Sequence, residues 1–295
     1  MKIALHTPDK TKFPNYALMK ISAWHKKIGD TVTWFNAIER DSYKTIYSSS
    51  VFTQRGTDPY LPENTIYGGT GYGLFDSQLS QDIDNMFPDY SIYPNIDYAI
   101  GFLTRGCIRS CPWCVVPKKE GNIHAYRSWR DIVRTDTNKV ILMDNNVLAS
   151  DFGIFQINEL TKTNYRIDFN QGLDARLIAP AIAKLLAQIK WIRCIRLACD
   201  SQEMKEPVQR AVNYLRDAGL KNEIFVYVLV QDIDDALVDR VEFLRNIKCE
   251  PFAQPYRNVL TGTEPTQKQK NFARWVNHKA IFKTVKWEEY KQNLL

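Results

Sequence analysis

Residues 101–121 read GFLTRGCIRSCPWCVVPKKEG, a stretch that places three of the chain's six cysteines within eight residues. These three are Cys107, Cys111 and Cys114. The apolar segment AIGFLTR, at 99–105, precedes them and has the composition of a buried strand. Three thiols that directly follow a strand are well suited to bind zinc or an iron–sulfur cluster. The stretch therefore predicts a metal centre at the end of a strand.

Further strand candidates follow this one at the spacing of an α/β fold. They are KVILMDN (139–145), YRIDFNQ (165–171), IRCIRLACD (192–200), EIFVYVLV (223–230) and CEPFAQPY (249–256). Helical stretches, such as APAIAKLLAQIK at 179–190, lie between several of them. Six strands joined by crossover helices predict a partial (β/α)6 barrel over residues 99–256. In such a fold the working residues lie at the carboxyl ends of the strands, where the cysteines also fall.

The region before the barrel, residues 1–98, predicts a Rossmann-like domain. Strand candidates MKIALHT (1–7), TVTWFN (31–36) and YKTIYSSS (43–50) accompany a helical stripe that ends at Gly29, where a helix C-cap belongs. A fourth, TIYGGTGYG (65–73), runs into a loop with four of the thirteen glycines. Such a loop can bring backbone amides close to a phosphate, or it can be a tight turn. This order of strands and helices indicates a parallel α/β sheet.

The final segment, residues 257–295, is predicted to be helical and is basic. From Arg257 onward it has eight Lys and Arg against three Asp and Glu, whereas residues 1–100 have nine against eleven. A basic segment can contact phosphates, but a solvated helix face has the same composition. Trp275 and Trp287 could stack bases or anchor the helices in the core. Nucleic acid is therefore one candidate partner.

Composition indicates a globular protein. The chain has 295 residues, of which 44% are hydrophobic and 24% charged. No apolar run reaches the roughly 18 residues of a membrane span. The opening MKIALHTPDK lacks the apolar core of a signal peptide. We therefore expect a cytoplasmic protein with reduced thiols and no membrane contact.

The cysteine spacing separates two kinds of metal site. Structural zinc usually has four protein ligands, commonly in two separated pairs, whereas this loop holds a single triplet. His124, ten positions beyond Cys114, could serve as a fourth zinc ligand, but its distance along the chain makes it an ad hoc choice. A cubane cluster held by three cysteines instead leaves one iron open to an exogenous ligand.

The motif Cys107-Ile-Arg-Ser-Cys111-Pro-Trp-Cys114 is C-x3-C-x2-C with an aromatic residue before the last cysteine. It resembles the signature of the radical S-adenosylmethionine (radical SAM) superfamily. The resemblance implies a [4Fe-4S] cluster on these three catalytic, metal-binding cysteines, with SAM on its open iron. It also implies an external electron donor, flavodoxin- or ferredoxin-like, and cleavage of SAM to a 5′-deoxyadenosyl radical that abstracts a substrate hydrogen.

The resemblance also implies cofactor-binding residues at the strand ends. They are Trp113, Asn145, Asn146, Gln171 and Arg196. Trp113 would pack near the adenine, the two amides would accept from the SAM ammonium, and Arg196 would pair with its carboxylate. Asp174, Arg176 and Asp200 stand at the same strand ends. Structural hydrogen bonding is the alternative role for each of these residues.

The first hundred residues resemble the cobalamin-binding domain that precedes the barrel in one branch of the superfamily. The shared features are the order of strands and helices and the glycine pair at Gly68 and Gly69. The cobalamin pattern D-x-H-x-x-G is absent, because His6 is followed by Thr-Pro-Asp. The sequence therefore predicts a cobalamin-free relative of that domain, acting as a lid or substrate platform.

These inferences converge on a radical SAM enzyme whose substrate the sequence does not identify. One alternative is a radical SAM enzyme that modifies a nucleic acid or nucleotide base. Another is a non-catalytic module in which iron–sulfur or zinc only folds the loop. The remaining thiols, Cys194, Cys199 and Cys249, are scattered, and we expect them to be buried.

Overall fold

The computed structural model describes residues 1–52 and 58–292 and has a mixed α/β fold with mostly parallel sheets, which confirms the predicted class. Two compact units are present, Met1–Asp97 with Val259–Gly262 and Tyr98–Asn258 with Thr263–Leu295. Across the described ranges, no helix is both long and apolar enough to cross a membrane.

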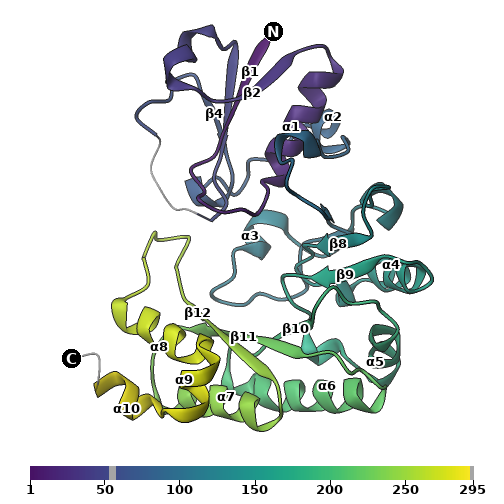
Figure 1. Ribbon diagram of the computed structural model, residues 1–295, viewed down its shortest axis with the longest axis vertical. Helices are drawn as coiled ribbons and strands as arrows, with labels where there is room; N and C mark the ends of the chain where they lie inside the picture. Colours follow the sequence, from purple (N-terminus) through teal and green to yellow (C-terminus); the bar gives the residue numbers. More distant parts are fainter. Residues whose placement is uncertain (53–57, 293–295) are drawn as a thin grey trace. The chain divides into compact units, whose positions relative to one another are not determined.

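The first unit is built on a four-stranded parallel sheet (Figure 1). Its strand order is β2 (Thr31–Trp34), β1 (Lys2–His6), β3 (Thr45–Ser49) and β4 (Ile66–Gly68). The central strand β1 buries Ile3, Ala4 and Leu5 almost completely. The four strands lie where apolar and β-branched residues predict them, because such residues favour a pleated surface covered on both faces.

Helix α1 (Tyr16–Lys27) packs against this sheet. The Asn15 side chain accepts a hydrogen bond from the backbone N–H of Leu18 and so caps the first turn. Gly29 follows the end of the helix, and its φ of +88° is the left-handed conformation that glycine adopts most easily. The shorter helical elements of this unit are η1 (Ala37–Ser42), η2 (Thr70–Tyr72), α2 (Gln81–Asp84) and η3 (Tyr90–Ile92).

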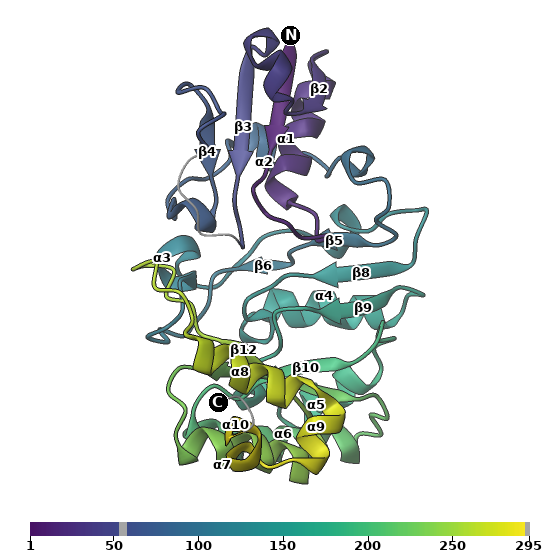
Figure 2. The ribbon, with the colours of Figure 1, turned by 60° about the vertical axis from the view of Figure 1, so that its left-hand side comes forward.

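The second unit contains six parallel strands that follow one another in chain order, and Figure 2 shows the first three of them side by side. They form two three-stranded sheets, β5 (Ala99–Gly101), β8 (Lys139–Leu142) and β9 (Arg166–Phe169), then β10 (Ile195–Ala198), β11 (Ile224–Val230) and β12 (Glu250–Pro255). Parallel bridges from Ile167 to Trp191 and from Leu173 to Leu197 connect the two sheets. All six strands occur at the positions that the apolar segments predict.

Crossover helices connect most of these strands. They are α4 (Asp151–Thr161), α5 (Pro180–Ala187), α6 (Lys205–Asp217) and α7 (Asp235–Asn246), with the short turns η4 (Trp129–Asp131), η5 (Val147–Ala149), η6 (Ala175–Leu177) and η7 (Gln202–Met204). Strand β11 alternates in burial, with Val226 and Val228 fully covered and Tyr227 between them half-buried. One face of the strand therefore packs into the core, while the other remains more open.

Three helices complete the second unit: α8 (Gln267–Asn277), α9 (Lys279–Thr284) and α10 (Trp287–Gln292). Thr266 and Gln269 form a reciprocal capping box that starts α8. Trp275 and Trp287 are buried, with ring centroids 5.6 Å apart. Both rings thus anchor the helices in the core and are not exposed for base stacking. Residues 293–295 of the predicted helical segment lie outside the described residues.

Candidate active site at the cysteine loop

The cysteine loop is closed at its base by a small antiparallel hairpin. Strands β6 (Thr104–Arg105) and β7 (His124–Ala125) pair, and the short helix α3 (Val116–Glu120) lies between them. Gly106 adopts a φ of +80°, and a Cβ atom there would stand 2.2 Å from the carbonyl oxygen of Asn122. The backbone N–H of Cys107 also donates to the carbonyl oxygen of Gly121 at 3.2 Å. These contacts fix both ends of the loop.

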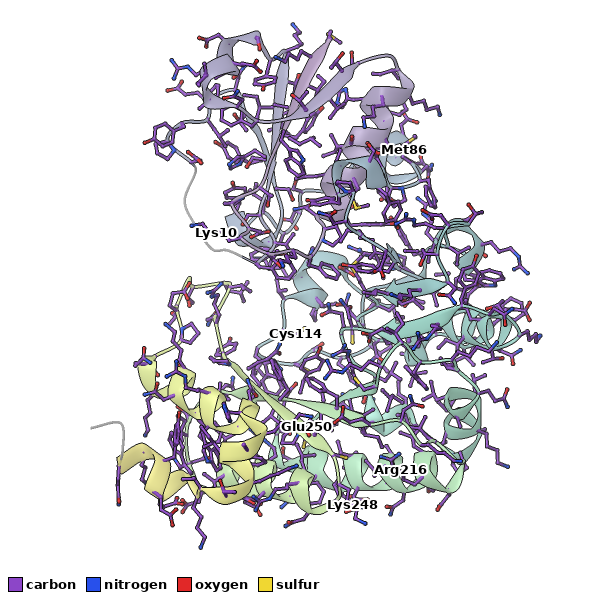
Figure 3. The ribbon with its side chains drawn as sticks, in the orientation of Figure 1. Lys10, Met86, Cys114, Arg216, Lys248 and Glu250 are labelled. Carbon is purple, nitrogen blue, oxygen red and sulfur yellow. The ribbon has the colours of Figure 1, made fainter. Side chains whose placement is uncertain are left out.

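The loop thiols differ from the other cysteines in exposure. Cys107, Cys111 and Cys114 are free and half-buried, whereas the other three are buried, as the sequence predicts (Figure 3 labels Cys114). Burial raises the pKa of Cys111 and of Cys114, and the neighbouring loop thiols raise both further. The loop thiols are therefore close enough to influence one another electrostatically.

Other metal ligands near the loop are few. His124 is exposed on β7, and its Nδ1 lies 3.0 Å from the carbonyl oxygen of Asn122. Within residues 1–52 and 58–292, no three His, Cys, Asp or Glu side chains are gathered closely enough to form a metal site as they stand.

Asp144 joins the end of β8 to the base of the loop. Its carboxylate accepts hydrogen bonds from the backbone N–H groups of Leu103 and Thr104 and from the Thr104 hydroxyl. Burial raises the pKa of Asp144 to about 6, although these hydrogen bonds oppose the shift. The carboxylate fixes the backbone immediately before Asn145 and Asn146.

Asn146 lies against the first cysteine. Its Nδ2 is 3.5 Å from Cys107 Sγ and 3.4 Å from an Asp174 carboxylate oxygen. Asn146 is 3% exposed, and its Oδ1 has no hydrogen-bond partner among the described residues. A buried amide oxygen without a partner costs about 1–3 kcal/mol, so this atom is an unsatisfied acceptor beside the first cysteine.

Asp174 holds the loop to the end of β9. Its carboxylate accepts from Arg109 Nε at 3.1 Å and from Arg176 Nε at 2.7 Å. Burial would raise the pKa of Asp174, but the two guanidinium groups outweigh it and lower the pKa. Arg109 lies between the first two loop cysteines, so this ion pair ties the thiol-bearing backbone to the sheet.

The next strand end also faces the thiols. Asp200 follows β10, and its carboxylate accepts from the backbone N–H of Leu229 at 2.9 Å. Burial raises the pKa of Asp200, and its charge in turn raises the pKa of Cys111 and Cys114. Residues after β8, β9 and β10 therefore surround the cysteine loop.

The remaining candidates have varied environments. Asn145 Nδ2 donates to Glu120 Oε2 at 2.8 Å, Gln171 is exposed, and Trp113 is half-buried on the loop. Arg196 forms a two-pronged ion pair with Asp168, through Nε and Nη2 at 2.7 Å each. Its Nη1 lies 3.4 Å from the Tyr227 hydroxyl. All three of its guanidinium nitrogens therefore already have a partner within the protein.

Sequence reasoning did not identify Glu120, which is central to the loop. It accepts from the Gly106 backbone and from Asn145, and it pairs with Arg105. Asp144 was equally missed as a functional residue, although an acid at the end of the apolar run VILM could have marked it.

No protein-family model matches this chain, and no curated protein is significantly similar to it. The cysteine motif and the residues around it therefore carry the functional assignment.

Proposed function

We propose that the protein is a radical SAM enzyme that binds one [4Fe-4S] cluster through Cys107, Cys111 and Cys114. The supporting observation is the C-x3-C-x2-C loop of free, half-buried thiols after the first of six parallel strands. In this proposal residues 99–256 form a partial (β/α)6 barrel, residues 1–98 a cobalamin-free Rossmann-like domain, and residues 257–295 a helical segment.

The loop residues suit a cluster that keeps one corner free. Three thiolates supply three of the four iron ligands of a cubane cluster. The Cys107 and Cys114 sulfurs accept from the backbone N–H groups of Arg109 and Val116, at 3.3 and 3.5 Å. Such bonds stabilise a thiolate's negative charge. When bound, the cluster and SAM would supply the radical chemistry, with an external electron donor of the flavodoxin or ferredoxin type.

The neighbouring residues suit the polar end of SAM. Asn146 Oδ1 would accept from the ammonium and satisfy its own unmade hydrogen bond. Glu120 would hold Asn145 at the edge of this site, and Trp113 would cover the adenine. Arg196 Nη1 has two N–H groups, so it would donate one to the SAM carboxylate beside its contact with the Tyr227 hydroxyl, while Asp168 occupies Nε and Nη2. Gln171 stands at the exposed rim.

The substrate class is open between a small molecule or peptide and a nucleic acid or nucleotide base. Exposed lysines of the C-terminal segment favour a nucleic acid or nucleotide base, since they offer phosphate contacts. They include Lys268, Lys270, Lys283 and Lys286. Binding of short RNA and DNA oligomers at low and moderate salt separates these classes.

The test is anaerobic reconstitution with iron and sulfide, followed by addition of SAM and a strong reductant. Wild-type protein should become brown, hold about four irons per chain and release 5′-deoxyadenosine. Cys111→Ala should lose both the cluster, seen as colour and iron, and the release of 5′-deoxyadenosine. Cys249→Ala, which removes a buried thiol outside the loop, should retain the cluster. A Cys111→Ala protein that still cleaves SAM, or wild-type protein that takes up only zinc, would refute the proposal.

A further inference from the structure

The second unit has a cavity of about 210 Å³ at the amino ends of β11 and β12, the opposite strand ends from those that surround the cysteine loop. Figure 3 labels Lys248 and Glu250 at this cavity and Cys114 on the loop. The charged residues that line it are Arg245, Lys248, Lys279, Lys283, Glu223 and Glu250. Four cations therefore face two carboxylates, and the cavity carries excess positive charge.

Two of the four cations are neutralised locally. Lys279 Nζ lies 3.1 Å from a Glu223 oxygen and 3.0 Å from a Glu250 oxygen. Arg245 pairs with Glu242, outside the lining, and donates to the Phe282 carbonyl oxygen at 2.9 Å.

The other two cations, Lys248 and Lys283, have no acidic partner and no side-chain hydrogen bond among the described residues. Both side chains are exposed at the cavity. Two unpaired ammonium groups beside one cavity repel each other, so they favour an anion between them.

Lys248 also has an unusual backbone conformation. Its φ of +59° is the left-handed region, and it is the one non-glycine residue with positive φ in the described chain. It follows helix α7 and closes it with two hydrogen bonds, from its own N–H to the Arg245 carbonyl oxygen and from the Cys249 N–H to that of Leu244, each 3.0 Å. This is the Schellman arrangement, whose left-handed position glycine usually fills.

The same chain uses glycine at this position in two other helices. Gly29 holds this position after helix α1 and Gly219 after helix α6, both with φ of +88° and the same pair of closing bonds. A lysine there costs backbone strain that glycine avoids. Strained residues persist where their side chains serve another purpose.

We propose that this cavity binds a phosphate group between the ammonium groups of Lys248 and Lys283. A phosphate offers several oxygens and up to two negative charges, and lysine binds it as a mobile point charge. Because Lys279 and Arg245 are already paired with carboxylates, the excess positive charge lies on Lys248 and Lys283, and the Glu223 and Glu250 carboxylates repel the anion toward these two lysines. This site is independent of the cysteine loop and of any cluster there.

The test is calorimetric titration of the full chain with inorganic phosphate at low ionic strength. Lys248→Gly should weaken binding roughly fivefold or more, since it removes one of the two contacts. The same substitution should raise the thermal unfolding midpoint, because glycine relieves the left-handed strain. Lys283→Gln should weaken binding similarly with an unchanged midpoint.

The matched control is Lys286→Gln, which removes one charge from an exposed lysine of the same segment outside the cavity lining. It should leave phosphate affinity unchanged. Equal losses in Lys286→Gln and Lys283→Gln, or no phosphate binding by wild-type protein at millimolar concentration, would overturn the proposal.

A second arm identifies the source of the phosphate. Short single-stranded RNA and DNA are tested for binding. If an oligomer binds, is displaced by inorganic phosphate and binds more weakly to the Lys248→Gly protein, the cavity contacts a nucleic-acid backbone. If inorganic phosphate binds but no oligomer does, the natural ligand of the cavity is a free phosphate or a nucleotide.

Discussion

The Arg196–Asp168 ion pair joins β10 to β9 in a largely buried setting, with side-chain exposures of 19% and 9%. Removing one partner leaves the other charge buried and uncompensated. We expect Arg196→Gln to lower the free energy of unfolding by about 3 kcal/mol. Asp168→Asn should cost a similar amount, and the double variant should cost clearly less than the sum of the two. Urea denaturation measures all three, and additive losses would show that the pair is not coupled.

Asp89 gives a pH-dependent prediction in the first unit. Burial alone would raise its pKa, but hydrogen bonds from Lys26, Ser22 and Ser91 lower it from 3.8 to about 2. A carboxyl group whose pKa is lowered on folding stabilises the protein above its unfolded pKa, and this contribution is lost as the pH falls from about 4 to 2. Asp89→Asn should therefore lower stability by about 1 kcal/mol at pH 7, after allowance for solvent screening.

The measurement is urea denaturation of Asp89→Asn and wild-type protein between pH 2 and pH 7. The two should converge toward the acid end. A constant difference across the range would mean that the charge of Asp89 does not contribute.

At this scale the sequence identifies residues whose partners are close along the chain. The three cysteines share eight positions, so their spacing alone reveals them. Asp144 and Glu120 act through residues far away in sequence, such as Leu103, 41 positions from Asp144, and Asn145, 25 positions from Glu120. No local pattern encodes those contacts. Arg196 was predicted as a ligand for SAM, a role that stays a prediction, while its pairing with Asp168 was not foreseen.

Among the elements, the β6–β7 hairpin is the one that the cysteine loop depends on most directly. Gly106→Ala would place a Cβ atom against the Asn122 carbonyl oxygen and strain a positive φ. We expect it to cost roughly 3 kcal/mol of unfolding free energy and to reduce iron retention after reconstitution. The control is Gly219→Ala, because that residue also has positive φ but no atom within 4 Å of the added Cβ.

Gly219→Ala should cost only about 1 kcal/mol, the backbone strain alone, and should retain full iron content. Equal behaviour of the two variants would mean that the close approach at Gly106 does not hold the loop.

The strands show which secondary-structure elements can be predicted from the sequence and which cannot. All six strands of the second unit coincide with apolar runs, because each strand buries at least one face in the core and so leaves a hydrophobic signal in the sequence. Strands β6 and β7 have two residues each, too few for any periodicity. The two strands pair because the two ends of the cysteine loop lie side by side in the folded chain, and this contact is tertiary.

At the scale of the whole molecule, the first unit raises the question of cobalamin. Its two histidines are both engaged within the protein. His6 Nδ1 lies 2.9 Å from Ser48 Oγ, and His25 lies between Asp30 at 2.7 Å and Tyr47 at 3.2 Å. We expect no corrin absorbance to remain after incubation with hydroxocobalamin and desalting. Stoichiometric retention of corrin would contradict this expectation.

The packing of two tryptophan rings between the C-terminal helices predicts a circular dichroism signal. Trp275 on α8 and Trp287 on α10 lie with ring centroids 5.6 Å apart, and Phe272 and Phe282 pack against them. Two indole chromophores this close couple their electronic transitions and give a paired signal of opposite sign in circular dichroism. Because the rings belong to different helices, the signal disappears when α10 separates from α8, even if both helices stay intact. The protein thus contains a built-in spectroscopic reporter of tertiary contact that requires no added label.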